Sequence, residues 1–179
     1  MLHSLHHAIG NYLLNNPLPN CILIRDPACG GNQHIPLFGP GPKSRKTEYC
    51  NVDMLLLRDQ HISVIIEIEE ANIKPTQICG KFLASALAYY FIHAKFDNQP
   101  IFMDKSVAFI QVLDTSKLKT GKTSKLNQFE NIANSIRAVI PLKNSKIDYY
   151  QLISGDIDTI DTINIQLLNC LDNFYQRPQ

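Results

Sequence analysis

The segment that most constrains the fold runs from Cys50 to Lys81 and reads CNVDMLLLRDQHISVIIEIEEANIKPTQICGK. It contains two apolar runs, NVDMLLLR and HISVIIEIEE, on either side of the polar pair Asp59-Gln60. Aliphatic and β-branched residues dominate both runs, and this pattern predicts two antiparallel strands of a hairpin. Because apolar residues fill intervening as well as alternate positions, we expect the hairpin inside a sheet that is covered on both faces.

Three carboxylates interrupt this apolar hairpin. Asp53 lies on the first strand, and Glu67 and Glu69 lie on the second. Side chains alternate across a strand, so Glu67 and Glu69 point to one face. A three-residue loop at 59–61 would put Asp53 opposite Glu67, whereas a two-residue loop would put it on the other face and separate the acids. We predict the three-residue loop.

Converging carboxylates in a core need a counter-charge, because buried like charges are costly unless something neutralises them. Hard divalent ions such as Mg²⁺ bind through a few carboxylate oxygens and retain waters for chemistry. The alternative is that Glu69 and Glu70 are solvated where the strand leaves the sheet, and that Asp53 is a polar residue near a turn. The spacing alone leaves both interpretations open.

This order of elements resembles the PD-(D/E)XK nuclease superfamily, which includes many restriction endonucleases and resolvases. The resemblance lies in VD followed by a turn, an apolar strand that ends EIE, and then a helix, and it covers roughly residues 21–114. It implies that Asp53 is the first metal ligand and Glu67 the second, with Mg²⁺ or Mn²⁺ as the ion. The chain would then be a restriction-type, metal-dependent endonuclease that hydrolyses DNA phosphodiester bonds.

The chain departs from the family's usual pattern in two places. The lysine position falls on Glu69, as in the minority of restriction endonucleases that have Glu-x-Glu, where Glu69 would complete the metal shell or accept a proton from water. In another variant the lysine lies on the following helix, where Lys81, or Lys74 as second choice, would serve; an ordinary surface lysine is the alternative. The family often has an acidic residue on its first helix, whereas the predicted first helix of this chain has none. These departures favour a second function, a non-catalytic nuclease-like module that binds nucleic acid or protein.

Length and composition predict one globular domain over residues 1–179, because 179 residues that are 45% hydrophobic and 18% charged can bury a sizeable core. We expect an α/β fold: a mixed central sheet of about five strands flanked by helices, with a restriction-endonuclease-like core at about 21–114 and a helical C-terminal extension at about 123–176. Apolar periodicity predicts the elements outside the hairpin. These are helices over 2–15, 76–96, 126–140 and 157–176, and strands over 21–25, 107–113 and 149–153.

Other features bear on the compartment and on metal binding. Five widely spaced cysteines without a CxxC pair predict reduced thiols and a cytoplasmic protein. No apolar run has the length of a membrane span, and no signal pattern opens the chain. Three histidines accompany the predicted first helix; they can bind metal adventitiously, but we expect them on a solvated face. They are His3, His6 and His7.

The net charge of +1 means that any contact with nucleic acid must come from local patches. Two loops are rich in basic residues, and each is either a phosphate-binding loop or a solvated turn. Their candidate DNA-binding residues are Lys43, Arg45 and Lys46, and Lys117, Lys119 and Lys122. The first loop lies in residues 28–48, a Gly- and Pro-rich segment that we expect to lack regular structure and to end near the carboxylates. The second is similar to a P-loop, but Ser116 replaces the leading glycine, which disfavours that assignment.

Cutting both strands of a DNA duplex would require two sites related by a twofold axis, so the nuclease interpretation predicts a homodimer. The apolar stripe of the helix at 157–176 is a candidate interface, although packing against the sheet explains the same stripe.

Overall fold

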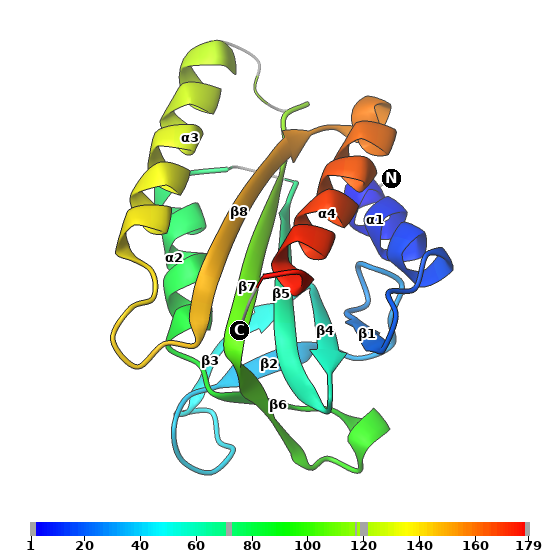
Figure 1. Cartoon of the computed structure of the whole chain (residues 1–179), viewed down its shortest axis with the longest axis vertical. Coiled ribbons are helices and arrows are strands. Elements are labelled where there is room, and N and C mark those ends of the chain that lie inside the picture. The colour runs from blue at the N-terminus through cyan, green and yellow to red at the C-terminus, as the bar shows by residue number, and fades with distance from the viewer. Residues whose placement is uncertain (1–2, 71–72, 117, 119–121, 178–179) are drawn as a thin grey trace.

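The computed structural model describes residues 3–70, 73–116, 118 and 122–177. Within them the chain forms an eight-stranded mixed sheet between two pairs of α-helices (Figure 1). α2 and α3 cover one face, and α1 and α4 cover the other. This confirms the predicted mixed α/β class, with more strands than expected.

The structure contains four α-helices, two short 3-10 helices and eight strands within the described residues. They are α1 (Ser4–Asn15), β1 (Cys21–Arg25), β2 (Ile35–Phe38), β3 (Glu48–Val52), β4 (Met54–Arg58), β5 (His61–Glu69), α2 (Pro75–Ala86), β6 (Tyr90–Ile92), η1 (Ala94–Phe96), β7 (Pro100–Asp114), α3 (Lys122–Val139), β8 (Ile147–Gly155), η2 (Ile157–Thr159) and α4 (Ile160–Tyr175). The sheet order is β1-β4-β5-β7-β6-β2-β3, and β8 pairs with β7.

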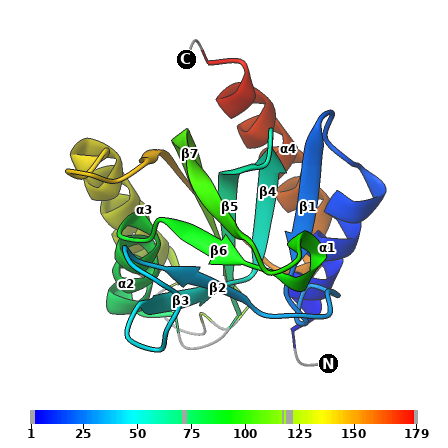
Figure 2. The same ribbon diagram turned by 90° about the horizontal axis from the view of Figure 1, so that it is seen from below.

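β5 and β7 form the centre of the sheet. β1, β4 and β5 are antiparallel neighbours, whereas β5, β7 and β8 run parallel to one another. The strand predicted over 107–113 is part of β7 and pairs in parallel with β5, with α2 in the crossover. The long strand β7 also pairs through its first residues with β6, and β6, β2 and β3 lie together at that end of the molecule (Figure 2).

The central hairpin differs from the prediction in its loop. Arg58 pairs with His61, so the loop contains only Asp59 and Gln60. Both residues have positive φ, 51° and 62°, which matches the tight two-residue turns whose twist suits a hairpin. The predicted three-residue loop is wrong.

A bulge restores the predicted register of the acids. Leu57 pairs with Ile62 but Leu56 pairs with Val64, so Ser63 is an extra residue on β5. The Ser63 hydroxyl donates to the Leu56 carbonyl at 3.0 Å, which ties the bulge to the neighbouring strand. From the bulge onward the strands are shifted by one residue, and Asp53, one step beyond the last paired residue of β4, falls opposite Glu67.

Further differences concern short strands. The predicted helix over 76–96 ends at Ala86, and Tyr90–Ile92 forms β6, because aromatic and branched residues there pair with both β2 and β7. The segment 28–48, expected to lack regular structure, contains β2 and the start of β3.

The apolar stripe of α4 packs on the sheet, so core packing accounts for it. Among the described helices, none is both long enough and apolar enough to cross a membrane.

Candidate active site

The acidic cluster, which we define as Asp53, Glu67 and Glu69, lies at the carboxyl end of β5. Glu67 is completely buried, Glu69 is 4% exposed, and the side chain of Asp53 is 14% exposed. Glu67 and Glu69 alternate with Ile66 and Ile68, which face α1 and α4, so the two acids point toward α2. The prediction that they share a face is confirmed, because both lie against one side chain of α2.

That side chain is Lys81. Its ammonium donates to Glu67 Oε2 at 2.8 Å and lies 3.9 Å from Glu69 Oε1. One turn earlier, Gln77 donates from its amide nitrogen to Glu69 Oε2. The helix begins at Pro75, shortly after β5 ends, and this short connection brings the first turns of α2 against the acids. Lys81 therefore contacts the acidic cluster and is not an ordinary surface lysine of α2.

Asp53 lies in the bend between β3 and β4. One of its oxygens, Oδ2, accepts a hydrogen bond from the Ile68 amide at 2.7 Å and lies 3.5 Å from His6 Nε2. Burial opposes ionisation, but the contacts with His6 and Ile68 outweigh it and hold the pKa of Asp53 below its usual value. These contacts favour the ionised form of Asp53 and hold its carboxylate against the end of β5.

Glu67 and Glu69 have the opposite tendency. Burial, followed by the charge of Asp53, raises the pKa of Glu67 well above its usual value, although Lys81 opposes the shift. Burial also raises the pKa of Glu69, against the effect of Lys81. Each of these glutamates has one buried oxygen, Oε1, that finds no hydrogen-bond partner in the described part of the chain.

These unpartnered oxygens are the observation that fits a divalent cation. A hard cation takes several carboxylate oxygens as ligands, and its charge would offset the mutual repulsion of the three acids. Asp53 and Glu67 are the residues that would hold it. In the described residues, however, the acidic cluster does not bring three ligand atoms within 4.8 Å of one another, so joint coordination requires these side chains to move closer together.

His6 is a site residue that sequence reasoning missed. It was expected on a solvated face, but it is only 6% exposed, and its backbone amide donates to Glu70 Oε1 at 2.8 Å. The available signal was its position three residues before Ile9 and seven before Leu13, which puts it on the apolar stripe of α1. His3 and His7 are exposed, as expected.

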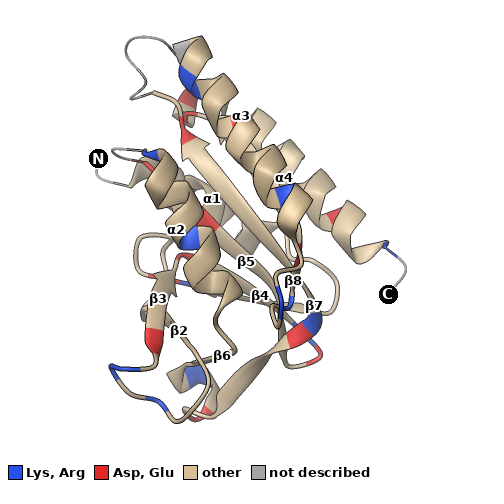
Figure 3. Ribbon diagram, turned by 90° about the vertical axis from the view of Figure 1, so that its left-hand side faces the viewer, with Lys and Arg blue, Asp and Glu red and all other residues tan. Residues whose placement is uncertain are grey.

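The basic loop Lys43, Arg45 and Lys46 does not lie beside the acidic cluster. Ile35 pairs with Val52 at the end of the β2–β3 hairpin next to Asp53, whereas the loop connects the opposite end (Figure 3). All three side chains are exposed. The expectation that this loop ends near the carboxylates is wrong, because residues 35–38 form a strand that carries the chain away. Lys117 and Lys119 lie outside the described residues, as does the side chain of Lys122 at the start of α3.

No family model, curated protein or solved structure matches this chain. The similarity to PD-(D/E)XK nucleases therefore stays a prediction that rests on the motif and on its setting in a hairpin followed by a helix.

The contacts of His6 make folding stability depend on pH. Burial lowers the pKa of His6, but Asp53 and Glu70 outweigh burial and raise it above its usual value. A raised histidine pKa contributes stability that is present below the unfolded pKa and is lost as the pH rises through the folded pKa. His6→Gln should therefore destabilise the protein by about 1.5 to 3 kcal/mol at pH 5.5, the range for polar contacts with a charged partner, and by less at pH 8.5.

Urea unfolding of both proteins across this pH range measures the difference. His7→Gln, on the exposed side of the same helix, is the matched control and should show no such trend. A loss of stability that is equal at both ends of the range would mean that His6 contributes by packing alone.

Proposed function

We propose that this protein is a metal-dependent endonuclease that hydrolyses DNA phosphodiester bonds at the carboxyl end of β5. The observation that carries the proposal is Glu67, a fully buried carboxylate at a strand end with one unpartnered oxygen and a lysine of the next helix 2.8 Å from the other. A buried acid with a strongly shifted pKa beside a specific charge partner is typical of functional sites. Asp53, Glu69 and Lys81 surround Glu67, and they are the other site residues that the resemblance implies.

Asp53 and Glu67 would bind Mg²⁺ or Mn²⁺, which when bound supplies an activated water and offsets charge on the scissile phosphate. Glu69 is suited to accept the proton from the attacking water, because its raised pKa brings it closer to neutral pH. Gln77 fixes one oxygen of Glu69 and so orients the carboxylate. Lys81, 32% exposed in its side chain, can turn its ammonium from Glu67 toward a phosphate oxygen, in the role of the family's lysine.

A second candidate is the non-catalytic module, and one observation favours it. Each acid already has a protein partner: Lys81 for Glu67, Gln77 for Glu69, and His6 with the Ile68 amide for Asp53. Such a network can hold α1 and α2 to the end of β5 without any catalytic role. Nucleic-acid or protein binding without turnover is what this alternative predicts.

The deciding experiment is a cleavage assay with supercoiled plasmid, single-stranded DNA and RNA in Mg²⁺ or Mn²⁺. The proposal expects cleavage of DNA that EDTA stops. Ca²⁺ should support binding but little cleavage, because its looser coordination positions water less well. Cutting both strands of a duplex would require a homodimer, because each copy of the chain has one site.

Any DNA affinity should depend on the basic loop, which is exposed and away from the acidic cluster. Replacing Lys43, Arg45 and Lys46 together with Ala should weaken binding and lower the slope of log affinity against log salt by about 0.9 for each phosphate that the variant no longer neutralises. Fluorescence anisotropy with labelled DNA at several salt concentrations measures both. The matched control removes three other exposed lysines, Lys95, Lys105 and Lys143. An unchanged slope in the first variant would place the DNA-binding surface elsewhere.

A further inference from the structure

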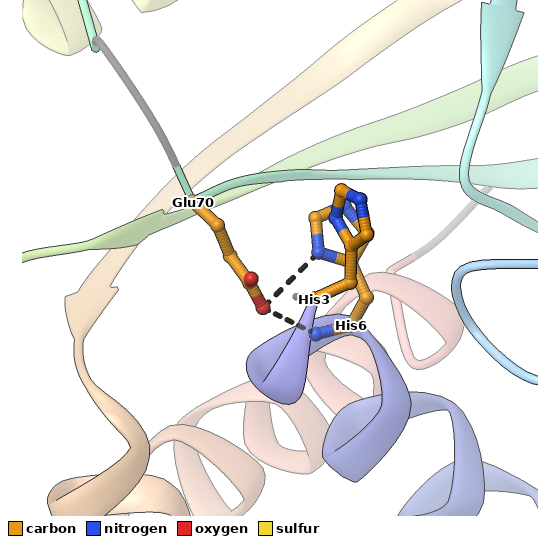
Figure 4. Close-up of side chains that lie close together, drawn as sticks. All are labelled: His3, His6 and Glu70. Atoms are coloured by element: carbon orange, nitrogen blue, oxygen red, sulfur yellow. Dashed lines mark hydrogen bonds and ion pairs between the residues drawn. The ribbon is translucent and has the colours of Figure 1, made fainter. Parts of the chain in front are cut away.

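A second group of potential ligands lies beside the acidic cluster, where the start of α1 meets the end of β5. We define the His–His–Glu cluster as His3, His6 and Glu70. Within the described residues it is the one group in which three ligand atoms from different side chains lie within 4.8 Å of one another. Figure 4 shows the Glu70 carboxylate directed at His6, with the imidazole of His3 beside that of His6. His3 precedes the first residue of α1 in a left-handed backbone conformation, and its ring centroid lies 5.1 Å from that of His6.

His6 is the central member of this cluster. Only 6% of its surface is exposed, yet its Nδ1 has no hydrogen-bond partner in the described part of the chain. This nitrogen points at Glu70 Oε1 from 3.2 Å (Figure 4). A buried imidazole nitrogen without a hydrogen bond loses favourable interactions with water, and a cation shared with Glu70 would replace them.

The other ring nitrogen of His6 supports the same conclusion. Nε2 lies 3.5 Å from Asp53 Oδ2, which is an acceptor position for an N–H. Metal-binding histidines commonly direct their second ring nitrogen to a carboxylate, which fixes the tautomer and leaves the first nitrogen free as a ligand. With a metal ion on Nδ1, the contact with Asp53 would keep the proton on Nε2, so the Nδ1 lone pair would be free to bind the ion beside Glu70.

We propose that His3, His6 and Glu70 bind a borderline transition-metal ion of the Zn²⁺ class. Two imidazoles and one carboxylate match the preference of Zn²⁺, Co²⁺ and Ni²⁺, whereas Mg²⁺ favours an all-oxygen shell. Ligands around a tetrahedral Zn²⁺ lie about 3.3 to 3.6 Å apart, so the three side chains must close slightly, and the exposed His3 has the freedom to do so. The ion would link the start of α1 to the end of β5, and its fourth coordination position would be open to solvent.

Cobalt titration of the untagged full chain, after removal of metals by chelator, tests the site. In excess Mg²⁺, which would occupy the acidic cluster, Co²⁺ should bind with one-to-one stoichiometry and give visible d–d absorption bands, and Zn²⁺ should abolish these bands by displacing it. Further Mg²⁺ should leave the bands unchanged. Because His6 is buried, the test uses His3→Ala and Glu70→Gln, each of which should weaken Co²⁺ binding at least tenfold without unfolding the protein.

Two further variants separate this site from its surroundings. His7→Ala removes an exposed histidine of the same helix, and Glu67→Gln alters the acidic cluster; both should leave the Co²⁺ bands and affinity unchanged. Wild-type protein that shows no stoichiometric Co²⁺ bands would overturn the proposal, as would bands that persist in both His3→Ala and Glu70→Gln. Loss of the bands in Glu67→Gln would also overturn it, because the ion would then sit among the three acids. None of these readouts depends on DNA cleavage.

Discussion

Replacing Asp53 with Asn or Glu67 with Gln should reduce DNA hydrolysis by a factor on the order of 10³ or more. Each change removes one negative charge from the pair that would bind the metal ion, and the charge stabilisation supplied by such an ion is worth several kcal/mol. Both replacements keep the shape of the side chain, so lost activity reports charge rather than packing. The rate of plasmid nicking in saturating Mg²⁺ or Mn²⁺ is the measurement.

Two exposed acids offer matched controls for these variants. Glu48→Gln and Asp172→Asn make the same chemical changes away from the acidic cluster and should retain full activity. The melting temperature of Glu67→Gln should hold or rise in metal-free buffer, because this change relieves repulsion among the three acids. Asp53→Asn should lower it, because His6 and the Ile68 amide stabilise the charge of Asp53 in the folded protein. If both variants unfold and the wild type never cleaves DNA with any metal ion, the acids are structural, and the non-catalytic module is the better function.

The acidic cluster illustrates what local sequence can and cannot determine. Apolar patterning identified the hairpin strands, and the spacing of Glu67 and Glu69 put both on one face. The predicted pairing of Asp53 with Glu67 is correct, but it was derived from a wrong loop length. The turn is one residue shorter than predicted, and the bulge at Ser63 compensates for the difference. A bulge depends on contacts with another strand, here the Leu56 carbonyl, and hairpin patterning alone does not include them.

Residues brought in from distant segments were the hardest to assign. His6 reaches the cluster from α1, and its contact with Glu70 joins residues 64 positions apart. The strands β2 and β6 pair across a similar separation, so the aromatic run at 89–92 is compatible with either a helix or a strand until its partner is known. Lys81 was easier to assign, because the resemblance already implies a lysine on the helix that follows the EIE strand. Gln77 lies one turn earlier on the same face of α2.

Replacing Lys81 with Met should destabilise the protein at pH 8 by about 2 to 3 kcal/mol, the largest stability effect expected here. The ammonium of Lys81 is 2.8 Å from a glutamate that is fully buried. Removing one partner of a buried ion pair typically costs about 3 to 5 kcal/mol, and the partial exposure of Lys81 reduces that figure.

The destabilisation should shrink as the pH falls toward 5. Burial already raises the pKa of Glu67, and removal of the neighbouring ammonium raises it further. An acid whose folded pKa exceeds its unfolded value takes up protons on folding, so stability falls as the pH rises above the unfolded pKa of about 4.5 and recovers as the pH falls. Urea unfolding at pH 5 and pH 8 measures the difference. Lys74→Met, an exposed lysine just before the same helix, is the control.

The double variant Lys81→Met/Glu67→Gln shows whether this cost arises from the Glu67 charge. It has no buried carboxylate to leave unpaired at this position, so it should regain most of the stability, and its pH dependence should flatten. Mg²⁺ should stabilise the single variant more than the double variant, because a cation beside Glu67 would replace the missing ammonium. A double variant no more stable than the single one, with equal destabilisation at pH 5 and pH 8, would show that Lys81 acts through its aliphatic chain rather than through its charge.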